Sequence, residues 1–188
     1  MSAVVAYLAG IILVLLAAKI LFDLIRAVVL RMRFYIRLKK FCAEQGYKMT
    51  KKRGIFASFF CMTKNADFTI EAREKFYSVR IITCFAHKMA YHFINERYYI
   101  RFTRFGYILP MSKSINKIRF CEKLKKMPEL KVAESENIKQ ILLLNPSPVE
   151  IFQLESNRMK KSLVTDGTVM YGWQVYGASG FLKMLKEI

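Results

Sequence analysis

The sequence predicts a single N-terminal transmembrane helix that continues into an amphipathic helix, followed by an α+β or α/β domain with a mixed β-sheet and flanking helices. Three observations lead to this fold class: an uncharged apolar run at the start, an apolar stripe at helical spacing after it, and alternating strand-like and helix-like segments in the remainder. The expected parts are a transmembrane helix at 1–22, a juxtamembrane helix at 23–45 and a domain at 46–188. The composition, 54% hydrophobic with a net charge of +18, excludes a disordered chain and fits two dissimilar parts.

The first segment is apolar over the length of a bilayer. No charged residue occurs from Ala3 to Leu16, the first charged side chain is Lys19, and the apolar run extends to Phe22. About 20 residues at about 1.5 Å each span roughly 30 Å of hydrocarbon. A cleaved signal peptide fits less well, because no basic segment precedes the run. We therefore expect the helix to stay in the mature protein.

The cations beside this segment predict its orientation. Residues 19–40 contain seven Lys and Arg against the single Asp23, and only Met1 and Ser2 precede the run. Because cations are retained on the cytoplasmic side, the N-terminus is expected outside and the domain in the cytoplasm. The juxtamembrane cations that could face anionic lipid are Arg26, Arg31, Arg33, Arg37, Lys39 and Lys40.

The juxtamembrane segment has the pattern of an amphipathic helix. Leu30, Phe34, Leu38 and Phe41 recur at spacings of four, four and three, and Gly46 is a natural stop. Either this apolar stripe lies in the headgroup interface or it packs on the domain that follows. The bulk of its Phe and Leu side chains favours packing on the domain.

The domain reads as strands interrupted and closed by helices. β-Branched and aromatic enrichment predicts the strands, Ser114 and Pro128 bracket a helix, and Asp166-Gly167 is a hairpin-type turn. The expected strands are Tyr47–Thr50, Ile55–Met62, Phe68–Ala72, Phe76–Cys84, the second half of His92–Phe105, Ile141–Leu144, Val149–Leu154 and Thr168–Tyr176, and the closing helix is Phe181–Ile188.

Positive charge is concentrated in the first half of the domain, with 19 cations against 6 anions over residues 48–131 and 6 against 6 over residues 132–188. On one expected strand Arg80 shares a face with Ser78 and Ile82. On another, alternate residues combine two cations with an aromatic ring. Were the two strands neighbours, their faces would form a platform for phosphate-bearing partners. The candidate anion-binding residues are Arg80, Arg97, Tyr99 and Arg101.

The residue types that carry catalysis or hold metals are not arranged for either task. The four cysteines, at 42, 61, 84 and 121, are far apart and include no Cys-x-x-Cys pair. His87 and His92 are five residues apart, which does not place two rings together on a helix. Gly177 to Gly180 precedes a helix but lacks the motif of a phosphate loop. We therefore expect no cofactor, no metal and no small-molecule substrate.

One arrangement resembles a known family. The amphipathic helix, Gly46-Tyr47 and the strands around Asp67 follow the order that opens restriction-endonuclease-like domains. That resemblance implies an Asp followed, on the next strand, by an acidic residue, one further residue and Lys, so that the carboxylates hold Mg²⁺ and the Lys stabilises the developing charge. Here the next strand reads Tyr77-Ser78-Val79-Arg80-Ile81 and has no carboxylate, while Glu71-Ala72-Arg73 lies only four residues after Asp67. The resemblance therefore implies a degenerate nuclease-like fold.

Together these features favour a non-catalytic protein over an enzyme. The expected function is a membrane-anchored basic module that binds an anionic lipid surface or a protein partner. The alternative is a membrane-tethered nucleic-acid-binding domain, whose affinity would fall steeply with salt.

Overall fold

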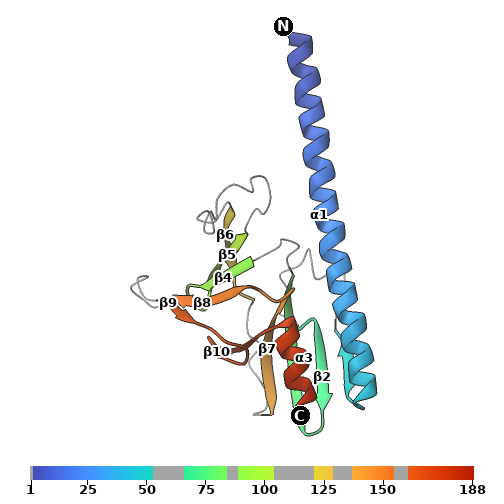
Figure 1. Cartoon of the computed structure of the whole chain (residues 1–188), viewed down its shortest axis with the longest axis vertical. Helices are drawn as coiled ribbons and strands as arrows, with labels where there is room; N and C mark the ends of the chain where they lie inside the picture. Colours follow the sequence, from blue (N-terminus) through green and yellow to red (C-terminus); the bar gives the residue numbers. More distant parts are fainter. Residues whose placement is uncertain (1, 53–65, 84–88, 104–120, 129–136, 155–160) are drawn as a thin grey trace, which may run out of the picture.

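The computed structural model describes residues 2–52, 66–83, 89–103, 121–128, 137–154 and 161–188. Its longest element is α1 (Ser2–Glu44), a single uninterrupted helix of 43 residues. The N-terminal half of α1 projects away from the rest of the molecule, and its C-terminal half lies against the domain (Figure 1). At about 1.5 Å per residue α1 is about 64 Å long, so it extends well past the thickness of a bilayer.

The end of α1 is fixed by a glycine motif. Gly46 has a φ of 71°, a left-handed conformation that favours glycine. The amide of Gly46 donates to the carbonyl of Ala43, and the amide of Tyr47 donates to that of Cys42 at 2.7 Å. These two bonds form a Schellman cap, which satisfies carbonyls that the helix leaves open. The predicted stop at Gly46 is confirmed.

The strands form two mixed sheets instead of one. The six-stranded sheet has the order β1-β2-β3-β7-β11-β10, in which β3, β7 and β11 run parallel. The five-stranded sheet has the order β6-β5-β4-β8-β9, in which only β4 and β8 run parallel. The six-stranded sheet consists of β1 (Lys48–Lys51), β2 (Phe68–Ala72), β3 (Lys75–Thr83), β7 (Ile138–Asn145), β10 (Val169–Met170) and β11 (Trp173–Gly177). The five-stranded sheet consists of β4 (Met89–Phe93), β5 (Tyr98–Thr103), β6 (Cys121–Lys126), β8 (Glu150–Leu154) and β9 (Lys161–Leu163).

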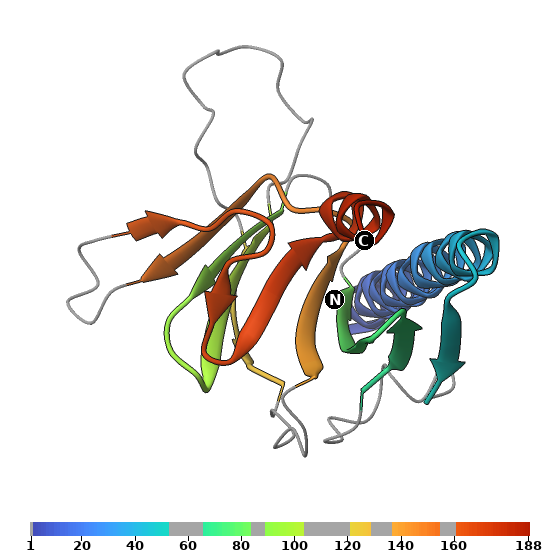
Figure 2. The ribbon, with the colours of Figure 1, turned by 90° about the horizontal axis from the view of Figure 1, so that it is seen from below.

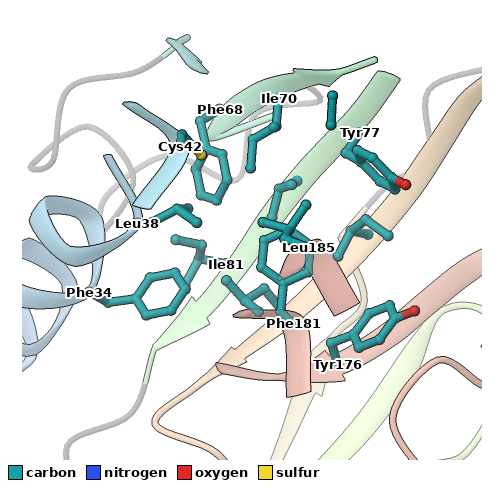
Figure 3. Close-up of a cluster of buried hydrophobic side chains, with 14 residues drawn as sticks. Phe34, Leu38, Cys42, Phe68, Ile70, Tyr77, Ile81, Tyr176, Phe181 and Leu185 are labelled. Atoms are coloured by element: carbon teal, nitrogen blue, oxygen red, sulfur yellow. The ribbon is translucent and has the colours of Figure 1, made fainter. Parts of the chain in front are cut away.

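Two hydrophobic cores divide the domain into layers. Figure 2 shows α1 and α3 (Ala178–Lys186) beside the six-stranded sheet, with the five-stranded sheet on the other side. The first core joins the helices to the six-stranded sheet through Leu38, Phe181 and Ile81, among others (Figure 3). The second core lies between the sheets, where Leu142 and Val175 meet Tyr91. The domain is therefore a helix layer on a sheet, backed by a second sheet, as expected for an α+β fold.

Most expected strands are present at nearly the expected positions. β2 matches its predicted range, and β1, β3, β7 and β8 differ from theirs by one to three residues at one or both ends. The expected strand at Thr168–Tyr176 is divided, because Tyr171 and Gly172 have φ values of 49° and 78° and turn the chain between β10 and β11. The closing helix begins three residues before Phe181, and the expected strand at Ile55–Met62 lies outside the described residues.

The helix expected between Ser114 and Pro128 is wrong for its described part. Residues 121–126 form the strand β6, which pairs with β5 over six residues, with Leu124 opposite Ile100. Leu124 is 61% exposed, so it is not on a buried helix face. The backbone pairing of β6 with the full length of β5 stabilises a strand more than the three-residue spacing of apolar side chains favours a helix. Residues 114–120 lie outside the described part of the chain.

Candidate functional site

The apolar part of α1 is exposed. The large hydrophobic residues between Val5 and Phe22 are between 48% and 79% exposed. In the described part of the chain, one helix is long and apolar enough to cross a membrane. Burial begins at Ala27, which is 4% exposed and lies little more than one turn beyond Phe22. The exposed apolar segment therefore enters the domain with no intervening linker.

A buried ion pair joins α1 to the six-stranded sheet. Nη2 of Arg31 lies 2.7 Å from Oδ1 of Asp67, and both side chains are at most 7% exposed. The other carboxylate oxygen of Asp67 accepts a hydrogen bond of 2.7 Å from the amide of Ile81 on β3. Nε of Arg80 lies 3.9 Å from that same oxygen. Asp67, directly before β2, is thus the acidic centre at which α1 and β3 meet.

The C-terminal end of β7 makes a second contact with α1 at the same level. Nδ2 of Asn145 donates to the backbone carbonyl of Leu30 at 3.4 Å, one residue before the ion-paired Arg31. Below this level Phe34, Leu38 and Cys42 are buried in the first core (Figure 3). Of the two readings of the juxtamembrane stripe, the structure shows the packed one. These contacts fix the position of α1 along the sheet.

The juxtamembrane cations lie at very different distances from the apolar segment. With about 1.5 Å per residue, Arg26 lies about 6 Å below Phe22, whereas Arg37 lies about 22 Å below it. Charges in solution are largely screened beyond a Debye length of about 8 Å. Of the six expected lipid-facing cations, Arg26 lies nearest the apolar segment, and Arg31 is ion-paired with Asp67. The other four expected cations, Arg33, Arg37, Lys39 and Lys40, are exposed further down the helix.

The edge strand β1 adds exposed cations beside Tyr35, on nearly the opposite side of α1 from Arg37. Lys51 places its ammonium group 5.3 Å from the ring centroid of Tyr35 on α1, and Lys52 is exposed. Lys40 is paired with Glu44 at 3.9 Å. We call the exposed Arg37 and Lys40 the distal basic surface. It lies on the part of α1 remote from the apolar segment.

The four candidate anion-binding residues do not come together on neighbouring strands. Arg80 is on β3 of one sheet and approaches Asp67, whereas the other three belong to the second sheet. Tyr99 is buried between the rings of Tyr91 and Phe93, at 5.9 and 5.7 Å. Arg97 is exposed and lies just before β5, while Arg101 is half-buried on that strand. The expected platform is therefore divided between two sheets.

Along the long axis of the molecule, β6 is the labelled strand of the second sheet that lies furthest toward the apolar end of α1 (Figure 1). It is also an edge strand of that sheet. Leu124 and Lys126 on β6 are exposed, and Lys125 is half-buried. The sequence pattern missed this edge because it predicted a helix there.

The nuclease-like arrangement lacks the chemistry of a metal site in its described residues. Asp67 is held by Arg31 and the Ile81 amide, and Glu71 is paired with Lys48 at 3.3 Å on the sheet edge. No group of three His, Cys, Asp or Glu side chains gathers among the residues that the structure describes. The stretch Tyr77–Ile81 of β3 has no carboxylate, and its Arg80 approaches Asp67. The order of helix and strands agrees with the resemblance, but these residues do not.

The N-terminus of α3 is already occupied by side chains of the protein. The amide of Gly177 donates to the Asp166 carboxylate at 2.6 Å, and the amide of Ser179 donates to Oγ of Ser147 at 3.0 Å. Asp166 also lies so close to Gly180 that a Cβ there would collide with it. An acidic group at a helix N-terminus is stabilising, so this stretch has a structural role.

The described thiol and imidazole side chains are buried in apolar surroundings. Cys42 lies in the first core, where burial raises the pKa of its thiol to about 11, so little thiolate is present at neutral pH. His92 is 2% exposed and lies edge-on to the ring of Phe152, with centroids 5.3 Å apart. His87, Cys61 and Cys84 lie outside the described residues, as does the side chain of Cys121.

Comparison with protein-family models, with curated proteins and with solved structures finds no match for this chain.

Proposed function

We propose that this chain is a single-pass membrane protein with its N-terminus outside and its basic domain in the cytoplasm, where the domain is a non-catalytic binding module. The observation that carries the proposal is the continuity of α1, exposed and apolar up to Phe22 and packed on the sheet from Ala27. Each large apolar side chain moved out of water contributes about 1.5–3 kcal/mol. A bilayer would remove the whole exposed apolar segment of α1 from water.

The rigid entry of α1 holds the domain against the bilayer surface. Arg26 lies at headgroup depth, and β6, with Leu124, Lys125 and Lys126, is the labelled strand of the second sheet that lies furthest toward the apolar end of α1 (Figure 1). A cation close to an anionic leaflet contributes about 1 kcal/mol. The proposed contact of the domain with anionic lipid is therefore made by Arg26 and the β6 edge.

Membrane insertion and orientation are tested first. The full-length protein should stay in the membrane fraction after washing with alkaline carbonate. Protease added to inside-out vesicles should digest the domain, and protease added to right-side-out vesicles should not. Release by carbonate would reject the anchor, and the reverse protection pattern would reject the orientation.

The lipid contact is tested with the full-length protein in nanodiscs. An environment-sensitive fluorophore on Leu124→Cys should shift to the blue when anionic lipid replaces neutral lipid, because β6 then meets the headgroups. The matched control is Leu163→Cys on β9, which is 65% exposed on the opposite edge of the same sheet. The shift at Leu124 should be lost when Lys125 and Lys126 are changed to Glu. Equal shifts at both edges would reject the contact.

The distal basic surface favours a second binding activity toward a nucleic acid. Its cations lie more than about 20 Å below Phe22, too far for screened attraction to headgroups. Full-length protein in neutral nanodiscs should bind duplex or single-stranded nucleic acid with an affinity that falls steeply with salt. Changing both Arg37 and Lys40 on α1 to Glu should weaken this binding. Changing both Arg97 and Lys126 to Glu, which makes the same change of charge beside the five-stranded sheet, should weaken it less. Equal effects of the two pairs would indicate attraction by net charge without a site.

A further inference from the structure

A second apolar face of α1 points away from the domain. Phe22, Ile25, Val29, Met32 and Ile36 are 62%, 54%, 38%, 40% and 61% exposed. Their spacings are three, four, three and four residues. This face continues below the spanning segment into a region where charged residues alternate with apolar ones. It is therefore not explained by the apolar composition of a membrane span.

The face that packs on the domain lies on the opposite side of the helix. Ala27, Phe34 and Leu38 are at most 8% exposed, and Arg31 between them is ion-paired. With 3.6 residues per turn, these positions are centred about half a turn from the exposed face. In Figure 1 the domain likewise lies on one side of α1 only. The domain therefore leaves the exposed face accessible along its length.

The repeat of the exposed face averages 3.5 residues, which is the repeat of a coiled-coil seam. In heptad terms Phe22, Val29 and Ile36 occupy one core position, and Ile25 and Met32 occupy the other. Such a seam is complementary to a copy of itself. The occupant that the repeat fits is another helix with the same spacing.

The charges beside the seam select a parallel partner. Arg26, Arg33 and Lys40 lie along one flank, and Val28 and Tyr35 lie along the other. In a parallel pair the first flank of one helix faces the second flank of its partner, so cations face uncharged residues. In an antiparallel pair the cationic flanks would face each other and repel. Below Ile36 the next core position is Lys39, which ends the seam.

The exposed area of these five side chains approaches that of a specific interface. With roughly 150–200 Å² on a large apolar residue, the five side chains offer about 450 Å² in each copy. A pair would bury about 900 Å² below the span, close to the roughly 1,000 Å² of a specific interface. The apolar residues of the spanning segment on the same face add to this area.

We propose that α1 associates in parallel with α1 of a second copy of this chain, through the seam of Phe22, Ile25, Val29, Met32 and Ile36. The two domains then lie on opposite outer sides of the helix pair. Both copies enter the membrane with the same orientation, which is the arrangement that the flanking charges require.

Disulfide trapping in native membranes tests the proposal. The background is the full-length chain with Cys61, Cys84 and Cys121 changed to Ser. Cys42 is kept, because burial raises the pKa of its thiol to about 11 and leaves it poorly reactive. Ile25→Cys, Val29→Cys and Met32→Cys are introduced one at a time. The control is Arg37→Cys, which is exposed and lies off the seam, one residue beyond the last seam residue Ile36.

Each seam variant should give about ten-fold more disulfide-linked dimer than Arg37→Cys, because only seam positions approach within disulfide distance of their copies. All three should react, since an antiparallel pair aligns identical residues only near one crossing point. Val29→Glu with Met32→Glu should convert the detergent-solubilised protein to monomer, as measured by light scattering. Equal trapping at Arg37 and the seam, or no trapping, would overturn the proposal; the second result is the one expected if lipid or another protein covers the face.

Discussion

We expect the ion pair between Arg31 and Asp67 to be a main stabilising contact between α1 and the domain. Its charged atoms are 2.7 Å apart, and the two side chains are 7% and 6% exposed. Removing one member of a buried pair costs about 3–5 kcal/mol, because the other charge is left in a poorly solvated place. Changing Asp67 to Ala would also remove the acceptor of the Ile81 amide and the anion that Arg80 approaches.

The two single changes should differ in size. Asp67→Ala leaves two largely buried arginines near each other, so we expect a loss toward about 5 kcal/mol. Arg31→Met leaves Asp67 with the Ile81 amide and Arg80, so the loss should be nearer about 3 kcal/mol. Because the residues are in contact, the variant with both Arg31→Met and Asp67→Ala should lose less stability than the sum of the two single losses.

Unfolding of the full-length protein in detergent by urea measures these losses. Trp173 is the single tryptophan of the chain and is 4% exposed in the core between the sheets, so its fluorescence reports unfolding. Lys48→Met provides the control, because it breaks a surface pair with Glu71 and should cost less than about 1 kcal/mol. If Asp67→Ala cost no more than this control, or if the two changes were additive, this stabilising role would be refuted.

Three further perturbations follow from the packing. Gly180→Ala should destabilise the fold by about 1–3 kcal/mol, because the new Cβ would collide with Asp166. Gly10→Ala, whose Cβ meets no atom, should change stability little. The midpoints of urea unfolding compare the two variants. Leu38→Ala, at a fully buried position, should lower the free energy of unfolding by about 2–5 kcal/mol. Arg37→Ala, on the exposed side of α1, should change it by no more than about 0.5 kcal/mol. Equal losses would contradict the packing of α1 on the sheet. Burial raises the pKa of Tyr77 and of Tyr176 above the ordinary 10.0, so their neutral forms stabilise the fold below pH 10 and this contribution is lost as the pH rises through the folded-state values. Changing both to Phe should therefore reduce the fall in unfolding free energy between about pH 9 and about pH 11, and an unchanged slope would show that other groups cause it.

Periodicity in the sequence located most of the elements. The alternation in Phe68–Ala72 and the glycine at 46 place β2 and the end of α1, because both signals are local properties of the backbone. The helix predicted at Ser114 failed at β6 for the converse reason. A spacing of three residues is weak evidence when a full-length partner strand, β5, is present elsewhere in the chain.

The arrangement of the candidate site residues could not be predicted from periodicity alone. Alternation indicates that Arg97 and Arg101 belong to one strand, but it does not identify the neighbouring strands. The parallel pairing of β3 with β7 joins segments separated by more than fifty residues, and it assigns Arg80 to the sheet that does not contain β5. The role of Asp67 was also hidden, because its partner Arg31 lies on a helix 36 positions earlier.

The sequence by itself determined that the chain begins with an apolar helix of bilayer length, that cations follow it, and that a mixed domain of strands and helices comes next. These are properties of consecutive residues, and hydrophobicity and charge along the chain are enough to establish them. Only the tertiary structure decided which cations are available to partners. It placed Arg31 inside the domain, put Arg37 and Lys40 on α1 far from its apolar segment, and left one apolar face of α1 exposed. The reason is that burial and depth depend on which surfaces meet when α1 packs on the sheet, and that pairing is made between residues far apart in the sequence.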